Sequence, residues 1–258
     1  MNLAQGHVAG TDHPYLIPLI VLIGIGFMIW LLRDEDTSPP AIIWMQICFG
    51  IVGLLGAKAF SLYVRDWQLL EPASLELSTG WRYPGALIAM VVLLPLLRRV
   101  ILPRVATLRY FDALVLVFGL EVALWRISCY FNGCCLGGHC DAAYCLSYPA
   151  GTAVFHQHLN QGLIPPDAVA SLPVLPLHFL MMLASISVVL FLAWYSRYRQ
   201  YDGQLLLLYL FMHEGLKAIL ESQREPFIVQ LQTTSALVSL AALFAMLLIA
   251  LVRFRQDS

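Results

Sequence analysis

Five of the chain's six cysteines lie in one short stretch, from Trp125 to Cys145, which reads WRISCYFNGCCLGGHCDAAYC. Arg126 stands near its start, and Asn132 is followed by Gly133 in its middle. Thiolates can bind metals, exchange disulfides or attack an electrophile, and a guanidinium can bind phosphate through two parallel hydrogen bonds. The stretch therefore has the residue types of a metal site, of a disulfide knot or of an active site.

The spacing of the cysteines leaves these three chemistries open. After Gly133 they read CC-x4-C-x4-C with His139 among them, whereas structural zinc sites favour pairs about two to four residues apart. We therefore expect no metal and no other cofactor, with metal binding kept as an alternative. In an oxidising compartment a disulfide is the other alternative, and an odd number of cysteines leaves at least one thiol free. A free thiol beside Arg126, such as Cys134 or Cys135, could act as a nucleophile.

The composition indicates the setting of this stretch. The chain of 258 residues is 60% hydrophobic and 12% charged, with a mean hydropathy of +0.76, whereas soluble domains carry about 25% charged residues. A net charge of −1, without a basic stripe, gives no indication of a nucleic-acid partner, and we expect none. The first residues have no basic region typical of a signal peptide, so the first apolar run is expected to be a retained span.

Seven apolar runs approach the roughly 20 residues that a membrane helix needs. We predict an all-α integral membrane protein of seven transmembrane helices that forms a single domain over residues 1–258. The predicted spans are Tyr15–Leu32, Ala41–Val64, Pro84–Leu97, Phe111–Tyr130, Val174–Tyr195, Gln204–Leu220 and Thr234–Val252.

Positive charges predict the orientation of these spans. Most of the arginines lie in alternate connections or at the C-terminus, and cytoplasmic segments carry an excess of Lys and Arg. This pattern predicts an outer N-terminus and a cytoplasmic C-terminus, which seven spans satisfy. The residues on which it depends are Arg33, Arg98, Arg99, Arg104, Arg109, Arg197, Arg199, Arg253 and Arg255.

The remaining cations are predicted to gather at the outer leaflet, where the positive-inside bias should remove them. They are Lys58, Arg65, Arg82, Arg126, Lys217 and Arg224. Charges at membrane depth need a partner or a function. Structural ion pairs with Glu121, Glu214 or Glu221 are one explanation. An anionic ligand, such as a phospholipid headgroup, is the explanation that we favour.

One connection is much longer than the others. It runs from about residue 127 to 173, on the outer face in this topology, and it contains the cysteines and several Gly and Pro turn pairs. Loops of this length are usually functional or carry structure of their own. We expect an extracytoplasmic loop region here.

With the spans in place, the motifs resemble those of the prolipoprotein diacylglyceryl transferase family. The family signature reads roughly G-R-x-G-N-F-x-N-G-E-x-x-G, and W-R-I-S-C-Y-F-N-G-C-C-L-G occupies the corresponding stretch. Four positions match: Arg126, Asn132, Gly133 and Gly137. Cys129 and Cys134 replace the asparagine and the glutamate of the signature.

Three further blocks follow in the family's order. The family's H-G-G-L resembles Pro84-Gly85-Ala86-Leu87, which lacks the histidine. Its H-P-x-Q-L-Y resembles the segment 175–180, which keeps only the proline. Its Y-x-x-x-R-x-x-x-E-x-x-R-x-P-D resembles the segment 213–227, which keeps Glu221, Arg224 and Pro226 and has Lys217 for the first arginine. The chain is thus identified as a divergent, cysteine-rich member of the family.

The resemblance implies a multi-pass enzyme of the bacterial cytoplasmic (inner) membrane that moves a diacylglyceryl group from a phospholipid, with phosphatidylglycerol expected, to the thiol of a lipoprotein precursor or another acceptor. The implied substrate-binding residues are Arg126, Asn132, Gly133, Gly137, Lys217, Arg224 and Arg82. The implied catalytic residues are Arg126, Glu221, Cys134, Cys129 and His139.

The general base of such a reaction is open at this point. Pro84 cannot take a proton, and His139, His178 or Glu121 could replace the missing histidine. In an alternative version, Cys134 or Cys135 attacks the lipid itself. A different class of function, a thiol-redox or metal-binding membrane protein on the same fold, is also open, because fold alone does not fix function.

Overall fold

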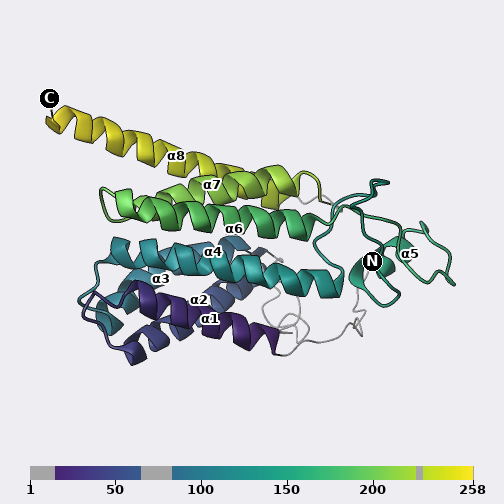
Figure 1. The fold of residues 1–258 in the computed structure, drawn as a ribbon, viewed down its shortest axis with the longest axis horizontal. Coiled ribbons are helices and arrows are strands. Elements are labelled where there is room, and N and C mark those ends of the chain that lie inside the picture. The colour runs from purple at the N-terminus through teal and green to yellow at the C-terminus, as the bar shows by residue number, and fades with distance from the viewer. Residues whose placement is uncertain (1–14, 65–82, 225–228, 258) are drawn as a thin grey trace. The chain divides into compact units, whose positions relative to one another are not determined.

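A computed structural model describes residues 15–64, 83–224 and 229–257 of the chain. Within these ranges the regular elements are helices (Figure 1). In chain order they are α1 (Leu16–Leu31), α2 (Pro39–Val64), α3 (Tyr83–Ile101), α4 (Thr107–Asn132), α5 (Ala153–Asn160), α6 (Leu177–Tyr195), the 3₁₀ turn η2 (Ser196–Tyr198), α7 (Gln204–Glu221) and α8 (Val229–Asp257).

The helices have the character of membrane spans. Four stretches of the described residues are long and apolar enough to cross a bilayer: Pro39–Ala59, Thr107–Asn132, Leu177–Tyr198 and Thr233–Ala250. Their apolar side chains face outward, as in α8, where Leu237 is 67% and Phe244 68% exposed. Such outward leucine and phenylalanine are expected of a surface that lies in lipid. An all-helical membrane protein is thus confirmed, while the number of spans and their orientation stay predictions.

Several helices extend past the ends that hydropathy predicts. Helix α3 continues from the predicted end at Leu97 to Ile101 and includes Arg98 and Arg99. The guanidinium of Arg98 turns back to donate to the carbonyl oxygens of Leu102 and Val105. These carbonyls follow the last turn, where backbone acceptors have no partner within the helix. Arg98 therefore stabilises the C-terminal end of α3, which hydropathy alone would place at Leu97.

The described residues fall into two compact units, of which one is Ile25–Leu114. In this unit α2 packs closely on α3, since a Cβ at Gly56 would lie 2.6 Å from the carbonyl oxygen of Gly85. Small residues allow such an approach of two apolar helices. Ion pairs join the α1–α2 connection to the α3–α4 connection and α4, between Arg104 and Asp36 and between Arg109 and Glu35.

The second unit contains α6, α7, α8, most of α4 and the long connection between α4 and α6. This connection has a small core of its own, in which Tyr148, Val154 and Val174 are buried with Leu136. Isolated β-bridges pair Leu146 with Val174 and connect other parts of the segment. The loop region that the sequence predicts is thus an ordered structure, although its extracytoplasmic position and the single-domain organisation stay predictions.

Candidate active site

The last turn of α4 and the residues that follow it bring three cysteines together. Cys129 lies in the last turn and is 4% exposed, and the backbone N–H of Cys134 donates to its carbonyl oxygen at 3.1 Å. The Sγ atoms of Cys129, Cys134 and Cys135 all lie within 4.8 Å of one another. We call these residues the cysteine cluster. Cys140 and Cys145, the other two cysteines of the stretch, form a disulfide with each other.

The backbone at the cluster adopts conformations that most residues avoid. Gly133 has φ +59°, and a Cβ there would lie 2.8 Å from the Cβ of Thr152. Cys135 has φ +57°, a left-handed conformation that is strained for a residue with a side chain. Together these two residues reverse the chain after α4 and bring Cys135 back to Cys129. Strain of this kind persists where surrounding structure enforces it, and it is common at functional sites.

Gly137 connects this loop to the end of α7. Its N–H donates to the carbonyl oxygen of Leu175 at 2.9 Å, and the residue forms a β-bridge with Arg224. A Cβ at Gly137 would lie 2.9 Å from the carbonyl oxygen of Gln223. The glycines of the N-G-x-x-x-G frame thus permit a chain reversal and a close backbone approach. Substrate binding by Gly133 and Gly137 stays a prediction.

Arg224 joins the cysteine cluster to α7. Its guanidinium donates to both carboxylate oxygens of Glu221, at 3.1 and 3.3 Å, and to Sγ of Cys135 at 3.6 Å. Glu221 is 1% exposed. A buried carboxylate needs a partner of opposite charge. The ion pair with Glu221 therefore holds the guanidinium of Arg224 in position beside the thiol of Cys135.

The ionisation of the cluster is unequal. Hydrogen bonds from the thiols of Cys129 and Cys134, together with the positive charges of Arg224 and Arg126, hold the pKa of Cys135 well below its ordinary value. Hydrogen bonds with Cys129 and Cys135, together with burial, raise the pKa of Cys134. The positive charges of Arg224 and Arg126 thus favour ionisation at Cys135 over ionisation at Cys134.

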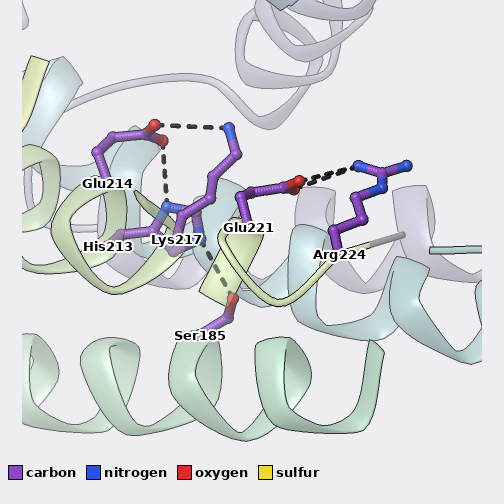
Figure 2. Close-up of polar contacts among 6 residues, drawn as sticks. All are labelled: Ser185, His213, Glu214, Lys217, Glu221 and Arg224. Carbon is purple, nitrogen blue, oxygen red and sulfur yellow. Dashed lines mark hydrogen bonds and ion pairs between the residues drawn. The ribbon is translucent and has the colours of Figure 1, made fainter. Parts of the chain in front are cut away.

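A row of polar groups runs along α7 (Figure 2). Nε2 of His213 lies 3.2 Å from the hydroxyl of Ser185 on α6, and its Nδ1 lies 3.3 Å from Oε1 of Glu214. The second oxygen of Glu214 accepts from Lys217 Nζ at 3.5 Å. The ring of His213 is also stacked on Tyr209 at 4.8 Å between centroids. We call Ser185, His213, Glu214 and Lys217 the α7 polar row.

The α7 polar row borders a small pocket between α4, α6 and α7. Arg126 of α4 lines this pocket together with Ser185, His213 and Lys217, and apolar residues of α6 and α7 complete it. Nε of Arg126 is buried, and it has no hydrogen-bond partner among the described residues. A buried guanidinium N–H beside a pocket can donate a hydrogen bond to a group that enters the pocket. The pocket is small, and it brings together a guanidinium, an ammonium and an imidazole.

Other residues that the sequence analysis singles out lie in different settings. The side chain of His139 is 47% exposed and lies 3.6 Å from Asp141. The amide of Asn132 donates to the hydroxyl of Ser128 one turn earlier in α4. Arg82 lies outside the described residues, as does Arg65. Catalysis by His139 and substrate binding by Asn132 and Arg82 stay predictions.

The two other candidate bases, His178 and Glu121, differ in their surroundings. His178 is fully buried, with Nε2 3.4 Å from the hydroxyl of Tyr148, and burial raises the pKa of that hydroxyl, which stays neutral. Nδ1 of His178 has no hydrogen-bond partner in the part of the chain that the structure describes. The carboxylate of Glu121 lies against α1, since a Cβ at Gly24 would be 1.9 Å from its Oε1.

Sequence reasoning missed His213 and Ser185. They are 28 residues apart in the chain and meet only because α6 packs on α7. One signal was present, because His213, Glu214 and Lys217 occupy one helical face of an otherwise apolar run, where ionisable residues mark a functional site by default. Within α7, the family motif had assigned a role to Lys217 and Glu221 but none to His213.

The fold and the site define a helical membrane protein with a polar pocket between three of its helices. The sequence profile of the family described as prolipoprotein diacylglyceryl transferase matches residues 15–252. A phosphatidylglycerol–prolipoprotein diacylglyceryl transferase from Rhodopirellula baltica is 26% identical over an alignment of 165 residues, and the match covers 60% of this chain. The match covers 33% of the relative's own length.

The chain therefore belongs to the prolipoprotein diacylglyceryl transferase family, as its motifs predict.

Proposed function

We propose that the protein is a phospholipid-dependent transferase of the bacterial cytoplasmic membrane, which moves a diacylglyceryl or related lipid group to a thiol. Family membership supports the class of reaction. The observation that carries the proposal for this chain is the pocket lined by Arg126 and Lys217, with its unpaired guanidinium N–H. The relative's name specifies phosphatidylglycerol and a prolipoprotein as substrates of that protein, and we propose the same substrate classes here.

Arg126 and Lys217 would bind the phosphate of the lipid. A guanidinium forms charge-assisted hydrogen bonds to phosphate, and the ammonium of Lys217 adds a second positive charge on the facing helix. Glu214 keeps that ammonium in place at 3.5 Å. As the carbon–oxygen bond of the diacylglyceryl group breaks, negative charge gathers on the leaving glycerol phosphate. Fixed positive groups stabilise this charge in the transition state.

His213 is the proton acceptor that the pocket offers. Its contact with Glu214 fits a tautomer in which Nδ1–H donates to the carboxylate, which leaves Nε2 as the acceptor facing Ser185. In the proposed reaction the acceptor thiol loses its proton to His213 or to water. Its sulfur forms the new carbon–sulfur bond, and the glycerol phosphate leaves with the electron pair of the broken carbon–oxygen bond. A covalent intermediate on Cys134 is a weaker version, because its pKa is raised.

The proposed topology has seven spans with an outer N-terminus and a cytoplasmic C-terminus. The structure has a helix of between 16 and 29 residues at each of the seven predicted runs, which supports the count. The positive charges of alternate connections support the orientation. In this topology the loop with the cysteine cluster lies on the outer side, where lipoprotein precursors would arrive.

The direct test is turnover by the purified full-length chain. Protein in lipid vesicles is incubated with labelled phosphatidylglycerol and a peptide that carries a lipoprotein-type cysteine, and products are identified by mass spectrometry. We expect a diacylglyceryl-peptide that disappears with Arg126→Ala and persists with Arg197→Ala, which removes an exposed arginine of η2. Absence of turnover with every common phospholipid would contradict the transferase and favour a redox or metal-binding protein on this fold.

A further inference from the structure

We propose that the cysteine cluster is a binding site for a thiophilic cation, Zn²⁺ or Cu⁺, with the three sulfurs of Cys129, Cys134 and Cys135 as ligands. The sequence predicted no metal because the spacing of the cysteines after Gly133 differs from that of structural zinc sites. The structure selects a different set, because it adds Cys129 from α4 and removes Cys140 and Cys145, which form a disulfide.

The geometry of the cluster fits one metal ion. Three thiolates at about 2.3 Å from a common zinc ion are about 3.8–4.0 Å apart. The three Sγ atoms lie within 4.8 Å of one another, so a shift of a few tenths of an ångström at each sulfur forms the site. Thiolate ligands favour Zn²⁺ and Cu⁺ over harder cations. The left-handed conformation of Cys135 is the local strain through which the third sulfur reaches the other two.

The charges around the cluster fit a metal–thiolate centre. Three thiolates carry three negative charges, and a bound Zn²⁺ or Cu⁺ leaves one or two of them uncompensated. Arg224 donates to Sγ of Cys135 at 3.6 Å, and Glu221 holds the guanidinium in that position. Hydrogen bonds to a ligand atom from such a supporting residue orient the ligand and tune the metal. If the cluster only formed disulfides, the hydrogen bond from Arg224 to Cys135 would have no function.

The cluster offers three protein ligands, and this number has a consequence for chemistry. Catalytic zinc sites keep three protein ligands and leave the fourth position to water or substrate. Resting on the function proposed above, the thiol of the acceptor would occupy the fourth position. A thiol that coordinates such a cation is deprotonated. The acceptor S–H proton then passes to water, the metal-held sulfur forms the bond to the diacylglyceryl carbon, and glycerol phosphate leaves with the electron pair of the carbon–oxygen bond.

This arrangement explains two departures from the family signature together. Cys129 and Cys134 stand where the signature has an asparagine and a glutamate, and Pro84 stands where another block has a histidine. A cation that deprotonates the acceptor thiol removes the requirement for a histidine at position 84. With this cation in place, the proton of the acceptor thiol goes to water rather than to His213.

The first experiment measures metal binding without any lipid. The full-length protein, purified and stripped with a chelator, is titrated in separate arms with Zn²⁺ and with Cu⁺ under reducing, oxygen-free conditions, and bound metal is counted by mass spectrometry. We expect one ion per chain of one of the two metals, and at least a tenfold loss of affinity in Cys129→Ser, Cys134→Ser and Cys135→Ser. Cys48→Ser, which changes a cysteine of α2, should leave the affinity unchanged.

A second measurement on the unchanged protein covers the case in which a cysteine variant fails to fold. Bound metal should slow alkylation of Cys129, Cys134 and Cys135 by iodoacetamide at least tenfold and leave Cys48 unaffected. Equal alkylation of the three thiols with and without metal would overturn the site. So would a disulfide within the cluster in protein prepared without reductant, or metal bound with equal affinity by all three cysteine variants.

The catalytic consequence is tested separately from the transferase itself. With metal bound, transfer to the peptide thiol is expected, and removal of the metal should abolish it until the same metal is restored. Transfer that persists in the stripped protein would overturn the role of the metal and leave the proposed transferase intact. Metal binding without transfer by any form would retain the site and contradict the proposed function.

Discussion

One ion pair of the unit Ile25–Leu114 differs in its exposure from two ion pairs of the other unit. In the unit Ile25–Leu114, Arg104 pairs with Asp36 where both side chains are mostly exposed, at 68% and 82%. In the other unit, Glu214 and Glu221 are each 1% exposed, and each holds a cation that faces a pocket or a thiol. The first kind of pair joins connections between helices. The second kind keeps buried charges in fixed positions, which is what binding an anion or a metal requires.

The largest difference should be in the reactivity of Cys135, which lies beside a buried ion pair. In stripped protein the rate of iodoacetamide labelling at Cys135 should change less than about threefold between about pH 6 and pH 8, because its pKa lies well below this range and the thiolate is present throughout. An unperturbed cysteine in a peptide should label about a hundredfold faster at the higher pH. The labelling rate at each cysteine is measured by mass spectrometry of the peptides that contain it.

A rate at Cys135 that rises with pH as steeply as in the reference peptide would show that its neighbours do not stabilise the thiolate. The variant Arg224→Gln serves as the matched probe, since it removes the nearest positive charge. It should increase the pH dependence of labelling at Cys135.

The next effect concerns the free energy of unfolding. Glu221→Ala leaves the guanidinium of Arg224, with 20% of its side chain exposed, without its carboxylate partner. Breaking a buried pair by removing one partner destabilises by about 3–5 kcal/mol, and partial exposure reduces the expected loss to about 2–3 kcal/mol. Denaturant unfolding of the protein in detergent, followed by circular dichroism, measures it. If Glu221→Ala lowered the free energy of unfolding by less than loss of the exposed pair Arg104–Asp36 does, the comparison between the units would be contradicted.

Two glycines of the second unit provide a smaller, matched effect. Gly133 and Gly151 both have positive φ, at +59° and +93°, but only at Gly133 would a Cβ clash, 2.8 Å from Thr152. Gly133→Ala is expected to lower the free energy of unfolding by about 2 kcal/mol or more. Gly151→Ala should lower it by about 1 kcal/mol, which is the cost of the positive φ alone. The same unfolding assay compares them, and equal losses would argue against close packing of the turn after α4.

The smallest effect should come from the exposed pair. Asp36→Asn removes the partner of Arg104 and is expected to change the free energy of unfolding by less than about 1 kcal/mol. Added salt should reduce this difference further, because exposed charges are screened. A loss comparable to that of Glu221→Ala would show that pairs in both units are equally structural.

The sequence predicted the long helices well, because an apolar run of membrane length has few alternatives. Its errors fall at helix ends, as at Arg98, where a charged side chain bonds carbonyls beyond the helix and hydropathy counts it as a connection. The family motif led to Arg126 and to Glu221, which the structure finds at the pocket and beside the cysteine cluster.

Contacts between distant segments could not be predicted in the same way. The grouping of Cys129 with Cys135 depends on the left-handed turn through Gly133 and Cys135, and a motif records spacing rather than backbone direction. The contact of His213 with Ser185 depends on how α6 packs against α7. Hydropathy predicts neither the register of two packed apolar helices nor the reversal of a loop.

We propose above that the pocket of Arg126, His213 and Lys217 serves phospholipid-dependent transfer to a thiol. The most direct measurement is the mass of the peptide product after incubation of full-length protein with phosphatidylglycerol labelled in its acyl chains. We expect a peptide that gains one diacylglyceryl group, at a rate that is at least about a hundredfold lower in Arg126→Ala and unchanged in Arg197→Ala. An unmodified peptide with every lipid, or equal rates in both variants, would contradict it.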